Sequence, residues 1–498
     1  MSDVEPAVVP PDEGLRLDSP AGRWVLLVTV LGSGMAFLDG TVVNVALPTI
    51  GRDLDASFAG LSWIANGYLV TLASLILVGG SVGDRLGRKR TYLAGAGAFA
   101  LASLVCGVAP NVATLVGARA LQGVAGAFLV PGSLALLQTT FHPDDRAKAI
   151  GTWSGLAGIT TAIGPFVGGW LVEAASWRWV FLLNLPLAAV VVLVGQRHLL
   201  ESRDPTIEGR PDLAGAALGA AGLALSTYGL IQESPAVGVL GLVVLATFVV
   251  VEARVAHPML PLGIFRSRQF SGANAVTFAV YAALSAVLFL LSLVLQQALG
   301  YTPLAAGSAT VPLTLMMLAF SSRSGALAQR IGPRIPMTVG PAVIAVGMVL
   351  MLRIEDGGSY VSQVLPALLV FSAGLVLTVA PLTSTVLAAA DARHAGVASG
   401  VNNAVSRTAG LLAVAGLPLV AGFDASAEVG GATLLDGFHR ATLVGAGLAL
   451  VGAVVACLTI RSDVLEATAD EEQEPCYSCA VSSPPTPHRE PASSAPVK

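Results

Sequence analysis

Residues 80–90 read GSVGDRLGRKR, and residues 325–334 read GALAQRIGPR. Both segments fit the pattern G-x-(L/V)-x-x-R-x-G-x-(R/K), and each lies at the end of a long apolar run. A short basic segment that recurs half a chain later indicates two halves of similar build, as in transporters with internal repeats. The repeat therefore predicts a membrane transporter made of two helical bundles.

The composition supports a membrane protein. Hydrophobic residues make up 54% of the chain and charged residues only 12%, against about a quarter in soluble globular proteins. The 55 glycines suit membrane helices, which pack through small residues. The net charge of −4 is small and the basic residues are scattered, so we expect no nucleic-acid partner. The sequence has no GxxxxGK[ST] nucleotide loop and no HExxH motif, so an enzyme is not expected.

Long apolar runs recur between short polar loops, and each run is long enough to cross a bilayer. They occupy residues 24–48, 61–81, 91–110, 112–138, 149–173, 177–196, 212–232, 236–253, 270–297, 303–322, 335–354, 361–388, 397–423 and 438–460. A single run could be a buried soluble helix, but fourteen of them could not. The sequence predicts an all-α integral membrane protein with fourteen transmembrane helices.

The position of the repeat divides these helices. Its first copy follows the second run and its second copy follows the tenth, so two six-helix bundles flank two extra linker helices. The predicted domains are a disordered cytosolic N-terminus (1–22), an N-terminal bundle (23–200), a linker with two helices (201–260), a C-terminal bundle (261–461) and a disordered cytosolic tail (462–498).

The distribution of positive charge predicts the orientation. With the N-terminus inside, nineteen arginines and lysines near the membrane fall on the cytosolic side, and only Arg52, Arg178, Arg353 and Arg440 fall outside. Both termini are therefore expected in the cytosol. The first residues lack the basic region of a signal peptide, so the first run should stay in the mature protein. Cys476 and Cys479 form a lone CxxC without a second pair, and we expect no metal site.

Asp39 is the one acidic residue deep within a predicted span. A charge at the bilayer centre costs about 2.5–3.5 kcal/mol on insertion scales, so this carboxyl group must face a cavity, pair with a cation or be protonated. A carboxyl group in that position can bind and release a proton, which makes Asp39 a candidate for proton coupling. The alternative is an aspartate that packs helices together through a hydrogen bond.

Arg119 and Arg407 are the arginines well inside predicted spans, and Gln122 lies one turn after Arg119. An arginine does not release its proton, so its role is to bias a nearby carboxylate or to hold backbone carbonyls. If Arg119 neighbours Asp39, protonation of the carboxylate would break an ion pair and change helix packing. A fixed structural arginine is the alternative for Arg119, and for Arg407 packing and function are both open.

The first copy of the repeat is a candidate gating loop. We expect Gly83 and Gly87 to permit a tight turn, and Asp84 to cap a facing helix or to pair with an arginine. In the second copy Gln329 stands in place of Asp84, so a charge-based latch should be weaker there. A purely topological signal is the other reading, because the cations alone would set the orientation. The candidate gating residues are Gly80, Gly83, Asp84, Arg85, Gly87 and Arg88.

Several segments resemble a known family. LDGTVVNVALP (38–48), GSVGDRLGRKR (80–90) and RALQG (119–123) resemble three signature motifs of the major facilitator superfamily. IGPFVGGW (163–170) resembles the fifth-helix motif of its drug:proton antiporters, and WRWVFLLNLP (177–186) and SGVNN (399–403) are similar to segments of the fourteen-spanning branch. The resemblance covers about residues 24–460. In the antiporter motif, Gly151, Gly164, Pro165, Gly168 and Gly169 match, whereas Thr160 replaces a glycine.

The resemblance implies a multi-pass protein of a bacterial plasma membrane that exports amphipathic organic compounds, such as drugs or antibiotics, in exchange for protons. The proton gradient would supply the energy, with no cofactor. The expected partners are a small organic substrate and the lipid bilayer, and the expected state is a monomer. The alternative is a proton-coupled uptake or exchange carrier for a metabolite in the same superfamily. Candidate substrate-lining residues are Asn44, Asn66, Gln122, Asn274 and Tyr281.

Overall fold

The structure is a computed structural model that describes residues 14–203, 212–255, 258–389, 395–422 and 431–463. In these ranges the chain folds almost entirely into helices and contains no β-strand. The helices are α1 (Pro20–Asp53), α2 (Phe58–Leu86), α3 (Arg88–Gly107), α4 (Val112–Thr140), α5 (Pro143–Ala174), α6 (Trp179–Leu182), α7 (Asn184–His198), α8 (Leu213–Ile231), α9 (Pro235–Glu252), η1 (Leu262–Arg266), α10 (Arg268–Leu293), η2 (Val294–Ala298), α11 (Pro303–Ala309), α12 (Val311–Ile331), α13 (Arg334–Met351), η3 (Tyr360–Val364), α14 (Leu365–Ala388), α15 (Ala395–Ala415), α16 (Leu417–Ala421) and α17 (Gly431–Thr459).

Among the described residues, 11 helical segments are long and apolar enough to cross a membrane. The chain is therefore a multi-pass membrane protein. The three further predicted spans coincide with α3, α5 and α15, which do not meet the same combined limits of length, hydropathy and charge. The all-α membrane fold agrees with the sequence, and the count of fourteen spans stays a prediction.

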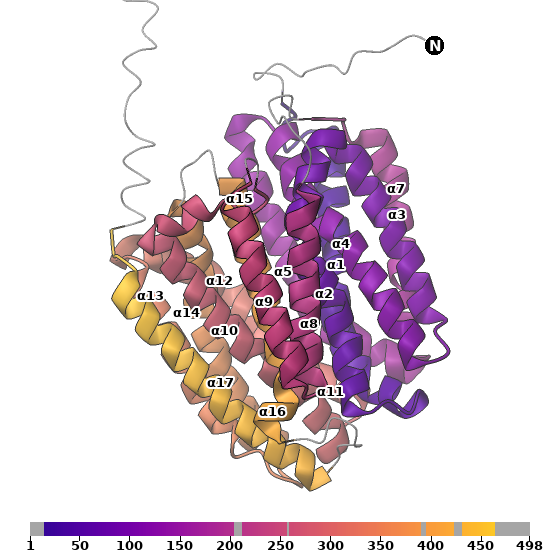
Figure 1. Ribbon diagram of the computed structural model, residues 1–498, viewed down its shortest axis with the longest axis vertical. Coiled ribbons are helices and arrows are strands. Elements are labelled where there is room, and N and C mark those ends of the chain that lie inside the picture. Colours follow the sequence, from indigo (N-terminus) through magenta and orange to yellow (C-terminus); the bar gives the residue numbers. More distant parts are fainter. Residues whose placement is uncertain (1–13, 204–211, 256–257, 390–394, 423–430, 464–498) are drawn as a thin grey trace, which may run out of the picture.

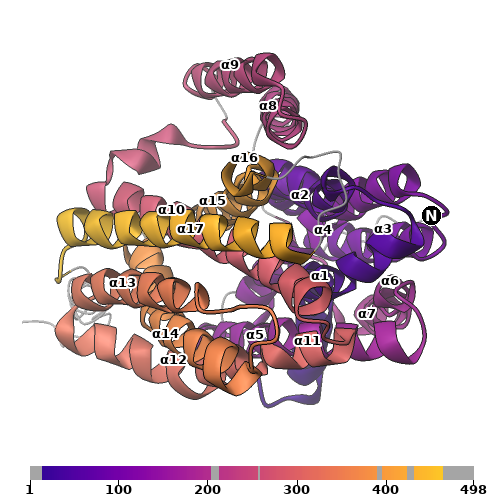
Figure 2. The ribbon, with the colours of Figure 1, turned by 90° about the horizontal axis from the view of Figure 1, so that it is seen from below.

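The helices gather into two groups, α1–α7 and α10–α17, with the α8–α9 hairpin on the outside (Figures 1 and 2). The hairpin lies where the two groups meet, because α8 packs on both α2 and α15. Leu223 of α8 clusters with Val70 of α2 and Leu411 of α15. This position is what two inserted helices between two bundles would adopt, although the predicted domain boundaries themselves stay a prediction.

Both copies of the repeat form the same local structure. α2 ends at Leu86 and α3 begins at Arg88, and Gly87 between them has a φ of 115°. In the second copy, Gly332 has a φ of 79° between α12 and α13. Glycine suits both turns because residues with a Cβ rarely adopt such backbone angles. Gly83, expected in the turn, instead lies within α2 because the helix continues as far as Leu86.

Three predicted spans are broken helices. α6 and α7 part at Leu183, α11 and α12 at Thr310, and α15 and α16 at Gly416. Proline accounts for two of these breaks, because Pro312 and Pro418, the second residues of α12 and α16, have no N–H to continue the preceding helix.

The first helix begins inside the N-terminal region that the sequence predicts to be disordered. The disordered region was expected to reach residue 22, but α1 begins at Pro20, where Ser19 caps it by accepting a hydrogen bond from Gly22 N at 3.0 Å. Leu15 bonds to the turn between α4 and α5, donating to Thr140 O at 2.9 Å and accepting from His142 N at 3.1 Å. Backbone pairing, which composition does not reveal, holds residues 14–19 at this end of the bundle. The end of the molecule where residues 14–19 contact the turn between α4 and α5 is called the near end, and the opposite end is called the far end.

The two groups of helices touch closely at the far end. A Cβ placed on Gly169 of α5 would overlap Pro303 O of α11, and one on Gly307 of α11 would overlap Pro165 O of α5. Beside them, Gln296 Nε2 donates to Val45 O at 2.9 Å. Side chains cannot be inserted between these backbones, so the far end is closed.

The near end is more open. A Cβ on Gly151 or Gly155, in the near-end half of α5, would meet no atom within 4 Å. Leu327 and Ile331 of α12, at the same end, are 40% and 41% exposed. The near-end halves of α5 and α12 are therefore exposed, while the far ends of α5 and α11 are in close contact.

Candidate functional site

A buried ion pair joins α1 to α4. Arg119 Nη1 donates a hydrogen bond to Asp39 Oδ2, and each residue is 1% exposed. Gln122, one turn after Arg119, donates from Nε2 to Asp39 Oδ1 at 2.7 Å and accepts from Arg119 Nη1 at 2.7 Å. The structure therefore brings together the two embedded charges that the sequence singled out, with Gln122 bridging them.

Two residues missed by the sequence analysis complete the network. Ser103 of α3 accepts a hydrogen bond from Gln122 Nε2 at 2.8 Å. Asn184 of α7 donates to Asp39 Oδ1 at 3.2 Å and to Ser103 Oγ at 3.3 Å. Asn184 lies in the WRWVFLLNLP segment, so that motif was a signal for it, whereas nothing distinguished Ser103 from other hydroxyls in apolar runs. Four helices of the first group thus share one hydrogen-bond network around Asp39.

The remaining surface of Arg119 is enclosed by the protein. Its Nε donates to Ile64 O at 3.2 Å, and its guanidinium carbon lies 4.6 Å from the centre of the Tyr68 ring and 5.9 Å from that of Phe181. Asp39 is the one carboxylate within 4 Å of this guanidinium among the described residues. Without the charge of Asp39, Arg119 would be an uncompensated buried cation.

The face of α1 that points toward the second group borders open space. A Cβ on Gly40 would meet no atom within 4 Å. Phe37 and Asn44, on the same side of α1, are half-buried although they lie well inside the helix. Across this space, the guanidinium carbon of Arg407 on α15 lies 5.5 Å from the centre of the Phe37 ring. A substrate that crosses between the two groups would meet these side chains.

Of the five candidate substrate-lining residues, two are half-buried and three are buried. Asn44 and Tyr281 are half-buried, whereas Asn66, Gln122 and Asn274 are buried. Gln122 belongs to the Asp39 network, and Asn274 accepts a hydrogen bond from Asn402 Nδ2 at 3.2 Å. Asn66 is fully buried, and neither polar atom of its side chain has a hydrogen-bond partner among the described residues. In this conformation only Asn44 and Tyr281 offer surface to a substrate.

The glycines of the antiporter motif bring backbones together. A Cβ on Gly168 would lie 3.0 Å from Val42 O, and one on Gly164 would overlap Thr41 Oγ1, so both glycines pack on α1. Gly169 instead faces α11 of the second group, and Gly151 faces open space. α5 remains helical through Pro165. The motif therefore serves two contacts, one within the first group and one between the groups.

The candidate gating loop is anchored within the first group. Asp84 Oδ1 accepts a hydrogen bond from Arg88 Nε at 2.7 Å. Glu201, which follows α7, accepts from the backbone N–H groups of Lys89 and Arg90 at 3.1 and 3.2 Å. This carboxylate caps the N-terminus of α3, where the helix dipole favours negative charge. The sequence analysis missed Glu201 because it is more than 100 residues from the loop that it caps. A gating role for the loop stays a prediction.

The two copies of the loop should differ in sensitivity. Asp84 is half-buried and paired, whereas Gln329, at the matching place, is exposed. We expect Asp84→Asn to slow transport strongly and Gln329→Ala to slow it only mildly, with both proteins inserted normally. The measurement is initial efflux rate divided by the amount of protein in the membrane. Equal defects would mean that the two loops act alike, without the help of charge.

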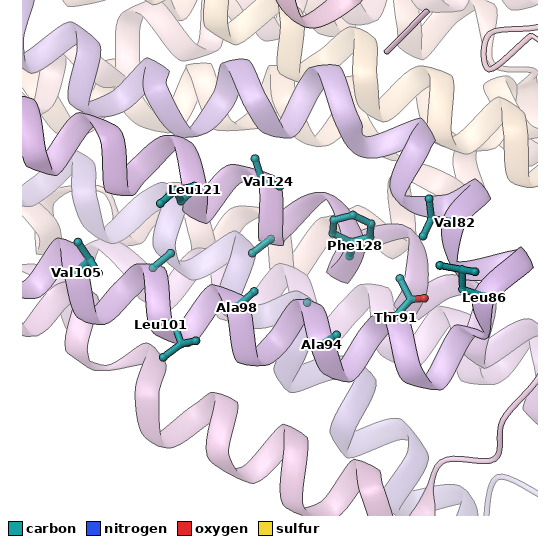
Figure 3. Close-up of a pocket in the computed structure, with 13 residues that line it drawn as sticks. Val82, Leu86, Thr91, Ala94, Ala98, Leu101, Val105, Leu121, Val124 and Phe128 are labelled. Atoms are coloured by element: carbon teal, nitrogen blue, oxygen red, sulfur yellow. The ribbon is translucent and has the colours of Figure 1, made fainter. Parts of the chain in front are cut away.

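The outer surface carries an apolar groove of about 580 Å³ between α2, α3 and α4 (Figure 3). Leu101 and Leu121, on its two walls, are 68% and 61% exposed, and Phe128 lies deeper along it. Thr91 supplies one hydroxyl among otherwise apolar side chains. A wall of this kind suits lipid chains and offers no charge or network for substrate recognition, so the groove is not the candidate site.

Comparison with known proteins adds a family assignment. The family model described as Major Facilitator Superfamily matches residues 29–415. The chain is 34% identical to the puromycin resistance protein pur8 of Streptomyces alboniger, covering 91% of this chain and 94% of the relative. It is 33% identical to the tetracenomycin C resistance and export protein of Streptomyces glaucescens, covering 93% and 95% of the two chains. A multidrug resistance protein, Stp, of Mycobacterium tuberculosis is 35% identical over 81% of this chain and 77% of its own.

Solved structures show the same fold at low sequence identity. A peptide transporter, POT, in complex with sulfate matches with a TM-score of 0.65 at 16% identity, over 93% of this chain and 96% of its own. A bacterial homologue of the human lysosomal transporter Spinster, in an inward-facing and unoccupied conformation, matches with a TM-score of 0.63 at 16% identity, over 90% and 98% of the two chains. These likenesses establish the fold alone.

Proposed function

Because the chain belongs to the major facilitator superfamily, we propose that it exports amphipathic organic compounds, drugs or antibiotics among them, across the plasma membrane in exchange for protons. The names of its relatives, which include a resistance and export protein and a multidrug resistance protein, support the export of such compounds. The observation that carries the proton-coupled part is the buried Asp39–Arg119 pair. We propose a monomer in the bilayer, with the small organic substrate as its one ligand besides the proton.

Asp39 is suited to couple proton binding to a change of conformation. It is fully enclosed and joins α1 to α4 and α7, through hydrogen bonds to Gln122 and Asn184 and the ion pair with Arg119. A proton on this carboxylate removes the attraction that holds Arg119 against α1. The resulting change in helix packing is the kind of two-state event that a transporter needs to switch the side to which it opens.

The shape of the protein fits export from the near end. We assign the near end to the cytosol, because the loops there carry most of the arginines and lysines. A cytosolic substrate would enter between the groups and reach the open space beside Gly40 while the contact between Gly169 and Pro303 keeps the far end closed. One proton crossing a potential of 100 mV supplies about 2.3 kcal/mol, enough for a roughly fifty-fold gradient of a neutral compound.

The decisive experiment separates an exporter from a proton-coupled uptake carrier. Purified protein is reconstituted into vesicles, a proton gradient is imposed, and the movement of a fluorescent amphipathic dye is followed. We expect the dye to move against the direction of proton flow and to stop doing so when a protonophore is added. Dye that moves in the same direction as the protons would instead support the uptake carrier, and vesicles that contain Asp39→Asn protein serve as the matched control.

The orientation can be tested with impermeant cysteine reagents. Glu233 lies in the α8–α9 turn at the far end, and Ser202 follows α7 at the near end. Added to intact cells, a maleimide reagent should label a cysteine placed at Glu233 and leave one at Ser202 unlabelled until the cells are opened. Labelling of both positions from outside would contradict cytosolic termini. We also expect residues 424–436 outside the cell; of these, 424–430 lie outside the described residues and 431–436 belong to α17.

A further inference from the structure

We propose that Arg407 binds the anionic group, a carboxylate or phenolate, of an amphipathic aromatic substrate in the open space between the two groups of helices. The proposal rests on the proposed export function and specifies which chemical class the exporter recognises. It starts from a single observation. A membrane-embedded arginine of the second group points at an aromatic ring of the first and has no acidic partner among the described residues.

Arg407 lies in the middle of α15, away from both ends of the helix. Its guanidinium carbon is 5.5 Å from the centre of the Phe37 ring on α1. The side chain thus reaches the boundary between the groups, where α1 borders open space at Gly40.

The charge of Arg407 is not compensated within the described protein. Arg119 has a carboxylate, an amide oxygen and a backbone carbonyl as partners. In the described ranges, Arg407 has no carboxylate oxygen within 4 Å and no hydrogen bond, and its guanidinium group lies over the ring of Phe37. The pair of Asp39 and Arg119 is neutral as a whole, so Arg407 gives the interior a net positive charge. A guanidinium group keeps its proton, and a cation in a membrane interior is costly unless something neutralises it.

An anionic aromatic substrate supplies the negative charge that neutralises Arg407. A guanidinium group can bind a carboxylate through two parallel hydrogen bonds, and a phenolate through one. The half-buried rings of Phe37 and Tyr281 offer apolar contacts to the rest of such a molecule, and half-buried Asn44 adds an amide. The absence of a side chain at Gly40 leaves room beside Phe37, one turn away on α1. A cationic compound, in contrast, would be repelled by Arg407.

Two dyes that share a xanthene ring system but differ in charge can test the proposal. Carboxyfluorescein is anionic and rhodamine 123 is cationic. Binding of each dye to purified protein is measured by fluorescence polarisation at low and high salt. We expect Arg407→Gln to weaken the binding of carboxyfluorescein about tenfold or more, since charge-assisted hydrogen bonds are lost. Arg407→Lys should retain part of the affinity because it keeps the charge but not the paired donors. Rhodamine binding should stay equal or increase.

Arg323→Gln is the matched control. Arg323 also lies over a phenylalanine in the second group, with its guanidinium carbon 5.4 Å from the centre of the Phe320 ring, but it is exposed on α12. Its replacement should leave the binding of both dyes unchanged. If Arg407→Gln binds carboxyfluorescein as the unaltered protein does, Arg407 is a packing residue and the proposal is overturned, while export stands. If cells that express the unaltered protein export neither dye nor any compound of a toxic panel, the proposed function itself fails.

Discussion

Asp39→Asn should abolish proton-driven export while the protein still reaches the membrane. An amide has nearly the shape of the carboxyl group but cannot exchange a proton, so the energy of the gradient could no longer be used. In reconstituted vesicles, we expect the accumulation of substrate driven by a proton gradient to fall to the level of empty vesicles. Downhill movement of the substrate should persist. Accumulation that survives in the variant and disappears with a protonophore would place the proton site elsewhere.

The same variant should also be less stable, for a reason that the structure makes specific. Arg119 would keep its charge at 1% exposure with no carboxylate to balance it. The loss of one partner of a buried pair costs about 3–5 kcal/mol. A double variant, Asp39→Asn with Arg119→Gln, removes the buried cation as well. It should therefore recover much of the thermal stability without restoring transport. If the double variant also recovers transport, Asp39 is a packing residue and not a coupling one.

Gly169→Val should hold the far end open. In the described conformation the backbone of α5 at Gly169 meets that of α11 at Pro303, and a branched side chain cannot fit between them. Forcing extra atoms into a close contact costs about 1–3 kcal/mol, which corresponds to a roughly 5- to 150-fold shift in the balance between two conformations. Since the contact exists only when the far end is closed, we expect export to be lost while the protein remains folded.

Labelling from outside the cell can detect this shift. A cysteine placed at Leu304, beside the contact, should react with an impermeant maleimide much faster in the Gly169→Val protein than in the protein with Gly169. Gly447→Val is the matched control, because a Cβ on Gly447 of α17 would meet no atom within 4 Å. Equal labelling rates in the two valine variants would show that the α5–α11 contact does not govern the opening of the far end.

The family, the all-α fold and the two embedded charges of the first half could be read from the sequence. Each depends on a property that a short segment carries by itself. Apolar runs reveal spans because a bilayer has a fixed thickness. A carboxylate inside such a run stands out because burying a charge without a partner is costly. The repeat, with Gly87 and Gly332 in equivalent turns, was visible because both copies need the same backbone angles.

Only the tertiary structure shows which side chains from distant parts of the sequence contact one another. Ser103 and Asn184 join Asp39, and Glu201 caps a helix more than 100 residues away, because of how the helices pack around one another. The exposure of Asn44 and the burial of Asn66 likewise depend on which face each helix turns toward its neighbours. The apolar pattern along these helices is much the same on every side, so it does not reveal that face. The sequence determined which charges had to find partners in the membrane. Packing between distant segments determined that Asp39 has a cationic partner, whereas Arg407 has no acidic partner among the described residues.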